Sequence, residues 1–408
     1  MKRQSVIFAT LVILASVLGY LVWRIDVPIR MNESIIQDDR QTIDQETEPE
    51  PALDTSLVSF VKEMAVTPDD TYSYGAFCRV NPMPNSDRFF VTFGGSNPDA
   101  QSKAVALSPF GGAEGGNGYS YKMYDVDFAY TGQHGVVHSG GGDAASVMAD
   151  DGYYYFLAGA PPEDWILKKI DPTTWKTVAS AHIDMDSPRE ILNDMMLAYA
   201  NGNLIASGLY DASGAAGGDQ KKSDPTVGMA THNRIFDTNL NLLDTFVLDD
   251  VPHINGSYVV FANGEYAYVT STSFFGDLIV MRYDENWNFI DSKTIDKGAQ
   301  WSQGASYDEA GGRFYVAYLD MPIGMNGKLE RGQSVNVAVG IYDADWNLVE
   351  KVMITDFVPL DDKNPGRPSL LLHDGMLYVS YDVASLPGRG EPEAKDWQCT
   401  VRAYELNP

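Results

Sequence analysis

An aromatic-rich segment, RFYVAYLD at residues 313–320, carries the pattern that decides the fold. A short run of aromatic and β-branched residues bounded by Gly and Asp is typical of a β-strand. Similar segments follow a Gly- or Asp-containing turn at five other places: RFFVTFG (88–94), YYYFLAG (153–159), NLIASGLY (203–210), EYAYVTSTS (265–273) and MLYVSYD (376–382). Recurrence of one unit predicts a repeat architecture from residue 55 onward.

Each of these segments is followed by a third predicted strand that ends in an apolar or aromatic residue and then an acid. The six endings are Tyr124-Asp125, Ile170-Asp171, Phe236-Asp237, Tyr283-Asp284, Tyr342-Asp343 and Tyr404-Glu405. Five units continue into a fourth strand, whereas the sixth ends at Pro408 after its third. Units of four short strands predict an all-β, six-bladed β-propeller. We expect Leu57–Ala65 to supply the missing strand and close the ring.

The two cysteines, Cys78 and Cys399, lie in the first and last predicted blades. Two cysteines are too few for a disulfide scaffold or for a zinc site made of cysteines. A disulfide across the seam is possible in an oxidising compartment. We expect two unpaired buried thiols instead.

The first 54 residues differ in composition from the rest of the chain. Residues 6–23 carry no charge and follow Lys2 and Arg3, a pattern that favours a transmembrane helix with an exported body. An uncleaved signal anchor over 1–24 is preferred to a signal peptide cleaved after Gly19. The acidic, Pro-containing residues 25–54 are predicted to form a disordered linker, and 55–408 the propeller. The propeller would then be extracytoplasmic, at the cell surface or in the periplasm.

The formal net charge is −27, which excludes a general nucleic-acid binder because phosphate neutralisation needs a basic face. We expect a polar small molecule, a glycan or an envelope protein as the partner, with the membrane contacted through the N-terminal helix.

Polar residues recur at one position of the innermost predicted strands, nine residues before the Gly of the following turn. These positions are Asp143, Asn193, Asn255, Gln303 and Gly366, which lies beside Arg367. Oxygen ligands gathered at the mouth of a central channel suit Ca²⁺ or the hydroxyl groups of a polar ligand. The alternative is that Asp and Asn only shape the entry into each strand.

Other candidates surround this predicted mouth. Trp301 could offer a flat apolar platform, as for a sugar ring, and His138 and His253 are the histidines best placed to reach it. Long insertions between second and third strands, at 95–118, 211–228, 321–335 and 383–397, fall on the same face. The Asp-x-Asn-x-Asn segments beginning at Asp237 and Asp284, and the related one at Asp343, lack the later residues of an EF-hand and are interpreted as turns.

The ring of oxygen-bearing residues is similar in character to the central calcium site of gluconolactonase- and paraoxonase-type propeller hydrolases. The resemblance implies Asn193 and Asn255 as asparagine ligands and Asp143 as the acidic ligand of a metal that polarises a lactone or ester. The sequence departs from that pattern at Gln303, and again in blade one, where Cys78 and Arg79 take the place of a carboxylate. The Ser-x-Asp-x-Gly-x-x-Trp repeat of sialidases is missing.

Three functional hypotheses remain. The preferred one is a membrane-tethered module that binds a polar ligand through Asp143, Asn193, Asn255, Gln303, Trp301, Arg367 and His138, with a possible Ca²⁺ ion. The second is a metal-dependent hydrolase of the lactonase, esterase or glycosidase kind, with His253 or Asp194 as base. The third is an envelope scaffold that has no site.

Overall fold

The computed structural model describes most of the chain from Ser56 to Asn407 and none of residues 1–55. The described ranges are 56–67, 76–97, 116–139, 144–158, 165–183, 190–211, 229–248, 258–271, 277–321, 334–358, 363–385 and 397–407. The predicted transmembrane helix and acidic linker therefore lie outside the described residues. Within the described ranges, no helix has the length and apolar character needed to cross a membrane.

The described residues form 24 strands in six antiparallel sheets of four strands each. Blades one to three comprise β2 (Ala76–Pro82), β3 (Phe89–Asn97), β4 (Gly116–Tyr124), β5 (Tyr130–Ser139); β6 (Ala144–Met148), β7 (Tyr154–Ala158), β8 (Trp165–Asp171), β9 (Lys176–Ile183); and β10 (Glu190–Ala200), β11 (Asn203–Asp211), β12 (Met229–Phe236), β13 (Leu242–Leu248). Blades four to six comprise β14 (Tyr258–Ala262), β15 (Glu265–Ser271), β16 (Leu278–Asp284), β17 (Phe289–Asp296); β18 (Ala299–Asp308), β19 (Arg313–Asp320), β20 (Asn336–Tyr342), β21 (Leu348–Met353); and β22 (Lys363–His373), β23 (Met376–Ser385), β24 (Trp397–Leu406), β1 (Val58–Ala65).

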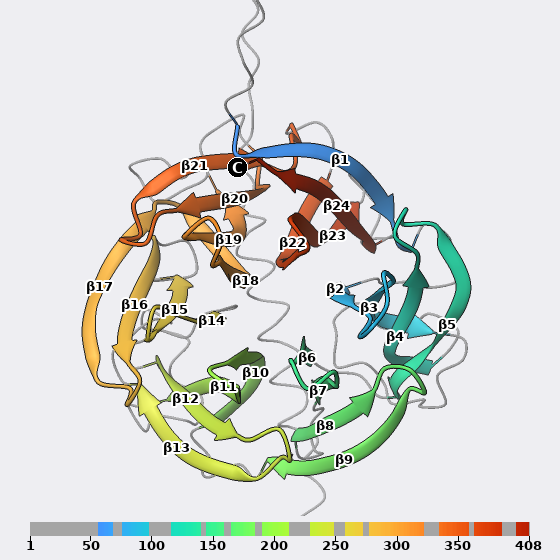
Figure 1. Ribbon diagram of the computed structural model, residues 1–408, viewed down its shortest axis with the longest axis horizontal. Helices are drawn as coiled ribbons and strands as arrows, with labels where there is room; N and C mark the ends of the chain where they lie inside the picture. The colour runs from blue at the N-terminus through green and yellow to red at the C-terminus, as the bar shows by residue number, and fades with distance from the viewer. Residues whose placement is uncertain are drawn as a thin grey trace, which may run out of the picture. The chain divides into compact units, whose positions relative to one another are not determined.

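The six sheets are arranged as blades around a common axis, which confirms the predicted six-bladed propeller (Figure 1). The first strand of each blade lies innermost and the fourth lies on the circumference (Figure 1). The inner strands are β2, β6, β10, β14, β18 and β22. This arrangement brings residues that are far apart in sequence to the same axis.

The ring is closed by the N-terminal strand of the propeller, as predicted. β1 pairs antiparallel with β24, with Val58 opposite Leu406 and Ala65 opposite Thr400. It supplies the outer strand of blade six, so that this edge of β24 is paired rather than exposed. Strand β1 therefore joins the two ends of the propeller sequence in one sheet.

A disulfide joins Cys78 on β2 to Cys399 on β24, so the expectation of two unpaired thiols is wrong. The Cα atoms of the two residues are 5.6 Å apart, within the range that a disulfide spans, and both side chains are fully buried. The bond connects blade one to blade six beside the seam. Sequence alone could not decide the pairing, because 321 residues separate the cysteines and only ring closure brings them together.

The buried apolar side chains among the described residues form six clusters, each built from the facing sheets of two neighbouring blades. The cluster between blades four and five, for example, joins Val269 and Val280 to Val316 and Tyr342. The aromatic residues that identify the repeat lie largely in these clusters, because each sheet must cover both of its faces with neighbours.

The Asp-containing segments between third and fourth strands are turns, as predicted. The Asp284 carboxylate accepts hydrogen bonds from the backbone N–H groups of Asn286 (2.9 Å) and Asn288 (2.8 Å). Trp287, in the same turn, has a positive φ of 62° and stacks on Tyr266, with 4.1 Å between ring centroids. The Asp side chain therefore stabilises a turn whose partly buried aromatic residue packs on the blade.

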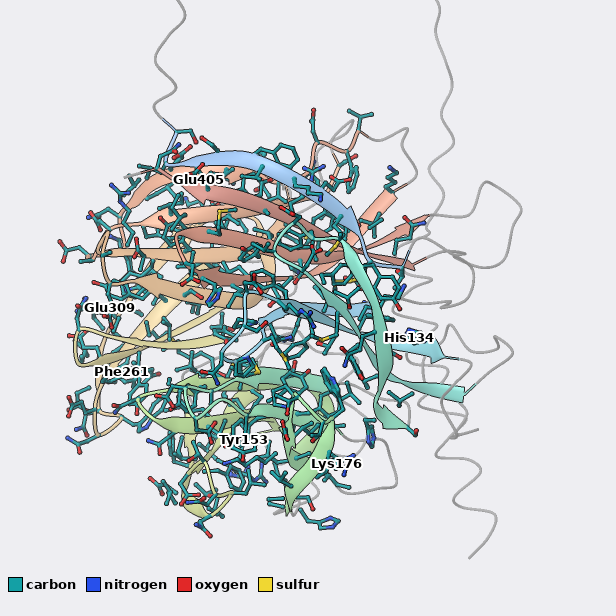
Figure 2. All side chains as sticks on the ribbon, turned by 45° about the vertical axis from the view of Figure 1, so that its right-hand side comes forward. His134, Tyr153, Lys176, Phe261, Glu309 and Glu405 are labelled. Carbon is teal, nitrogen blue, oxygen red and sulfur yellow. A yellow bond between two sulfur atoms is a disulfide. The ribbon has the colours of Figure 1, made fainter. Side chains whose placement is uncertain are left out.

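The two ends of the ring differ. The turns from first to second strand and from third to fourth strand lie at one end, called here the turn face; Glu309 and Phe261 mark it at the left edge of Figure 2. The inner strands begin at the opposite end, called here the mouth face. The predicted insertions between second and third strands connect strand ends at the mouth face, and most of their residues lie outside the described ranges.

Candidate functional site

Within the part of the chain that the structure describes, four of the six inner strands carry a β-bulge in the half nearer the mouth face. The pairing register shifts between Ala76 and Arg79 in β2, Ile191 and Met196 in β10, Gln300 and Gly304 in β18, and Gly366 and Ser369 in β22. A bulge leaves a residue outside the hydrogen-bonded ladder and re-aims side chains, and bulges are common beside functional sites. Regular pairing of the inner strands is therefore interrupted toward the mouth face.

Five of the residues predicted from sequence lie inside these bulges: Asn193, Asp194, Trp301, Gln303 and Arg367. They belong to blades three, five and six, so ring closure places them on three strands around one axis. Asp143, His253 and Asn255 lie outside the described residues. The backbone thus supports a shared location for part of the predicted ring, and the roles of the individual side chains stay predictions.

Arg79, the first residue after the β2 bulge, lies near the axis of the propeller. Its side chain is 8% exposed, and its Nη1 donates a hydrogen bond to Ser369 Oγ in blade six at 3.4 Å. Its charge also interacts with the hydroxyl groups of Tyr154 in blade two and Tyr258 in blade four. These long-range charge effects, and the contact with Ser369 on the inner strand β22, agree with the place of Arg79 on the inner strand β2.

We call Arg79, Tyr154, Tyr258 and Ser369 the axial cluster. Burial lowers the pKa of Arg79 below its usual value, and the neighbouring tyrosines oppose this shift. Burial raises the pKa of Tyr154 to about 12, and its hydroxyl donates to Thr92 Oγ1 at 3.2 Å. An arginine remains protonated in proteins, so at neutral pH the cluster combines one positive charge with neutral hydroxyl groups.

Arg367 is held by a buried carboxylate. It lies in the β22 bulge with a positive φ of 46°, unusual for a residue other than glycine. Its Nη1 forms an ion pair of 2.7 Å with Asp382 Oδ2 on β23. Asp382 is fully buried; burial raises its pKa and Arg367 opposes the shift. Among the described residues, Asp382 Oδ1 has no hydrogen-bond partner.

Sequence reasoning did not single out Asp382 or the axial position of Arg79. The signal for Asp382 was the acid that ends MLYVSYD (376–382), since an acid is unusual in an apolar strand. In the sequence, Arg79 stands out only as a departure from the calcium-ligand pattern. Its role as a side chain shared by several blades depends on the closed ring.

Blades five and six approach each other closely beside the axial cluster. A Cβ atom added to Gly304 on β18 would lie 2.5 Å from the backbone nitrogen of Leu370 and 3.0 Å from Ser369 Cα. Only glycine allows this approach without moving the backbone of β22. Gly304 directly follows Gln303 and is the first residue after the β18 bulge, so the close contact lies where the bulge ends.

The structure does not bring His138 to the inner strands. His138 lies on β5, an outermost strand, and its Nδ1 is 2.9 Å from Lys168 Nζ of blade two. Its ring also packs against Phe156, with 5.9 Å between centroids. Burial, followed by the charge of Lys168, lowers the pKa of His138 to about 4. His138 is therefore a neutral residue between two blades at physiological pH, and its assignment to the axial mouth is not supported.

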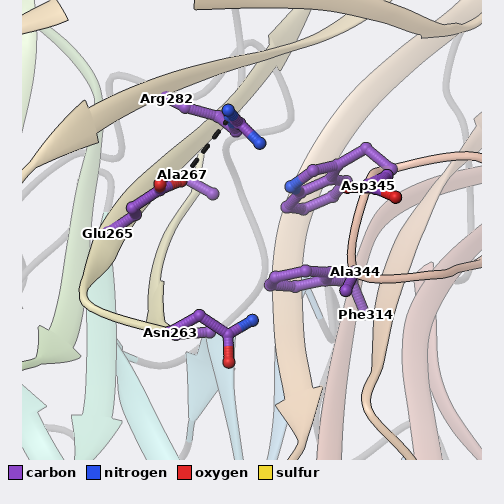
Figure 3. Close-up of a pocket in the computed structure, with 9 residues that line it drawn as sticks. Asn263, Glu265, Ala267, Arg282, Phe314, Ala344 and Asp345 are labelled. Carbon is purple, nitrogen blue, oxygen red and sulfur yellow. Dashed lines mark ion pairs between the residues drawn. The ribbon is translucent and has the colours of Figure 1, made fainter. Parts of the chain in front are cut away.

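Two grooves occupy the turn face, away from the bulges. The first, of about 250 Å³, lies between blades four and five, where Arg282 pairs with Glu265 at 3.6 Å beside Phe314 and Trp346 (Figure 3). The second, of about 560 Å³, lies between blades five and six and includes Arg313, His373 and Asp374. Neither contains a sequence-predicted site residue.

Within the described ranges, no group of three or more His, Cys, Asp and Glu side chains could hold a metal ion. Of the predicted calcium ligands, Asp143 and Asn255 lie outside those ranges, and Asn193 and Gln303 are carboxamides that such a group does not include, so the calcium prediction is not tested. Arg79 nevertheless places a positive charge near the axis, where it would repel a cation.

No protein-family model matches the sequence, and no curated protein is similar to it. Among solved structures, a subtype N11 neuraminidase-like protein of A/flat-faced bat/Peru has a TM-score of 0.46 and 10% identity, covering 85% of this chain and 94% of that one. Kuenenia stuttgartiensis hydrazine synthase has a TM-score of 0.43 and 13% identity, covering 75% and 76%. Similarity at this level indicates no ligand or activity.

Proposed function

We propose that this protein is an extracytoplasmic β-propeller, tethered to a membrane by its N-terminal segment, that binds a polar ligand at the mouth of its central channel. The observation that carries the proposal is the coincidence of two independent features. Four inner strands are bulged near the mouth face, and three of those bulges contain residues predicted to bind a ligand.

The residue types in the bulges suit a ligand rich in hydroxyl groups. The carboxamides of Asn193 and Gln303 both donate and accept hydrogen bonds, and Trp301 offers an aromatic surface for the apolar face of a sugar. A bulge also frees backbone N–H and C=O groups from the ladder. A small polyol or a glycan end is the ligand class that uses all three kinds of group.

The tether rests on sequence alone. Residues 6–23 are uncharged and follow two basic residues, and the acidic stretch that precedes Ser56 would space the propeller from the bilayer. The full chain is expected in the membrane fraction after a high-salt wash. Recovery of the full chain in the soluble fraction would contradict the tether without affecting the binding proposal.

Calcium is left out of this proposal because of the positive charge of Arg79 near the axis. The calcium ion predicted from Asp143, Asn193, Asn255 and Gln303 stays a prediction. The metal-dependent hydrolase, which would need that ion, stays a prediction too. If the protein were a scaffold without a binding site, the location of the bulges at the mouth face would have no functional explanation.

A double variant, Asn193→Ala/Gln303→Ala, tests the location of the site. The probes are maltotriose, cellotriose and chitotriose, with binding to the full chain in detergent measured by calorimetry. Loss of two carboxamides, at about 0.5–1.5 kcal/mol for each hydrogen bond, is expected to weaken binding by about tenfold. Asn286→Ala on the turn face is the matched control and should bind like wild type. A wild type that binds none of the probes, or a double variant that binds equally well, would contradict the proposal.

A further inference from the structure

We propose that the outer edge of β13 (Leu242–Leu248) is an interface at which two copies of this chain pair antiparallel, edge to edge, about a two-fold axis at Thr245. The inference goes beyond the polar-ligand site and does not depend on it. β13 is the outermost strand of blade three and lies on the circumference of the ring (Figure 1). One of its edges pairs with β12, and no described strand pairs with the other.

The other outermost strands carry features that discourage pairing with a further strand. Strands β1, β9, β17 and β21 each contain a lysine: Lys62, Lys176, Lys293 and Lys351. A lysine protects a strand edge because pairing would remove its charge from water. β5 has no lysine, but it contains Gly132 and Gly135 and shifts register twice against β4. β13 has neither lysine nor glycine, and Asp244 is its only charged residue.

The sequence of β13, LLDTFVL, reads similarly in both directions from Thr245. When two copies run antiparallel with this residue at the centre, apolar residues of one copy lie opposite apolar residues of the other. The pairs are Thr245 with Thr245, Asp244 with Phe246, Leu243 with Val247 and Leu242 with Leu248. Thr–Thr and aliphatic pairs directly opposite each other stabilise antiparallel sheets. A two-fold interface requires such a self-complementary surface, so a second copy of this chain is the occupant that the edge fits.

The edge also exposes apolar surface on a strand that is held in place. Leu242 and Leu243 are each 56% exposed, and Leu243 lies in a bulge outside the ladder with β12. Phe246 packs against Trp287 of blade four, with 4.9 Å between ring centroids. Pairing would therefore cover exposed leucine side chains without having to order the strand first.

The backbone of Thr245 supplies hydrogen-bonding groups at the centre of the proposed interface. Its N–H donates to Oδ1 of the adjacent Asp244 at 2.8 Å, a bond to a side chain and not to β12. In the paired state this N–H would donate to the carbonyl of Thr245 in the second copy, and the Asp244 carboxylate would return to water. Pairing thus exchanges one hydrogen bond for another in each copy, and Asp244 covers the donor while the chain is single.

Charge and size predict how strong the association is. The net charge of −27 on each chain opposes pairing of two copies, and salt screens this repulsion. The dimer should therefore become tighter as the NaCl concentration rises. Because one strand edge buries less than the roughly 1,200 Å² of a standard interface, we expect a dissociation constant of about 1–100 μM.

Sedimentation equilibrium of the full chain in detergent tests the interface. Wild type is expected to dimerise, and Leu243→Lys should weaken dimerisation at least about tenfold, because it places a charge opposite Val247 in both halves of the interface. Ile290→Lys, at the equivalent bulge of β17, is the matched control and should dimerise like wild type. Thermal unfolding checks that both variants fold.

Three results would overturn the proposal. The first is a wild type that stays monomeric at chain concentrations above the expected range. The second is a folded Leu243→Lys that associates like wild type, which would assign association to another part of the chain. The third is a wild-type dimer that dissociates as NaCl is added.

A cysteine at the proposed two-fold axis tests the register and does not depend on the behaviour of Leu243→Lys. Hydrogen-bonded residues opposite each other in an antiparallel pair have Cα atoms about 5.5 Å apart, within reach of a disulfide. The two native cysteines are bonded to each other, so Thr245→Cys introduces the only free thiol. Mild oxidation should convert Thr245→Cys into a covalent dimer on non-reducing gels. Ser292→Cys, at the equivalent position of β17, should stay monomeric. Absence of the Thr245→Cys dimer, or an equal yield from Ser292→Cys, would refute pairing through β13.

Discussion

Arg79 and Asp382 are buried ionisable residues whose pKa values are both shifted by burial toward the neutral form. The consequences differ because the two groups start from different pKa values. Arg79 remains charged because an arginine stays protonated in proteins, whereas the ionised form of Asp382 depends on its ion pair with Arg367. Burial therefore leaves Arg79 with a permanent positive charge, whereas the negative charge of Asp382 depends on its ion pair with Arg367.

The lowered pKa of His138 predicts that the free energy of unfolding depends on pH. Its pKa is lowered to about 4, below the value of about 6.5 expected in the unfolded chain. As pH falls from 6.5 to 4, the unfolded chain takes up a proton at this residue before the folded chain does, so the free energy of unfolding decreases by up to about 3 kcal/mol. His138→Gln should remove this part of the acid sensitivity.

The measurement is urea unfolding at pH 7, 5.5 and 4.5, with NMR titration of the imidazole. His134→Gln, on the same strand with an exposed ring, is the matched control. An acid sensitivity of His138→Gln equal to that of wild type would contradict the prediction, as would titration of His138 near pH 6.5.

At the scale of strands, the repeat predicted most of the structure. The predicted second strand RFYVAYLD coincides with β19 (Arg313–Asp320), and the other five differ from their predictions only near their ends. Alternating apolar residues bounded by turn residues determine such strands locally. The bulges were not predicted, because they depend on how an inner strand fits its neighbours at the axis.

Gly304 gives a prediction for the contact between β18 and β22. Gly304→Ala would place a methyl group 2.5 Å from the backbone nitrogen of Leu370, and backbone cannot rotate away as a side chain can. The free energy of unfolding is expected to fall by about 1–3 kcal/mol or more. Thermal unfolding measures the loss, and Ser306→Ala on the same strand is the control. Comparable stability of Gly304→Ala and wild type would show that the two strands can separate at little cost.

At the scale of the whole molecule, closure of the ring depends on β1 and on the disulfide between Cys78 and Cys399. Strand β1 pairs with β24 along its length, and Lys62 donates a hydrogen bond to the carbonyl of Asp127 in blade one. The disulfide crosses the same seam at the inner side, between β2 and β24. Hydrogen bonds and a disulfide therefore both hold the seam between blade one and blade six.

Removing the disulfide should destabilise the propeller. A cross-link between residues 321 positions apart restricts the unfolded chain strongly, so Cys78→Ser/Cys399→Ser is expected to lose about 2–5 kcal/mol. Urea unfolding of the double variant should match that of wild type under reducing conditions. A reductant that leaves wild-type stability unchanged would show that the hydrogen-bonded seam is sufficient.

The number of blades, the strands of each blade, the turns and the strand that closes the ring could be predicted from the amino-acid sequence, because they follow from local patterns repeated six times. The sequence also placed candidate residues near the starts of the inner strands. The folded ring was needed to show that Cys78 bonds Cys399, that Arg367 pairs with Asp382, that His138 lies on an outermost strand and that Arg79 lies on an inner one. Those facts depend on distances between blades, which exist only once the ring has closed.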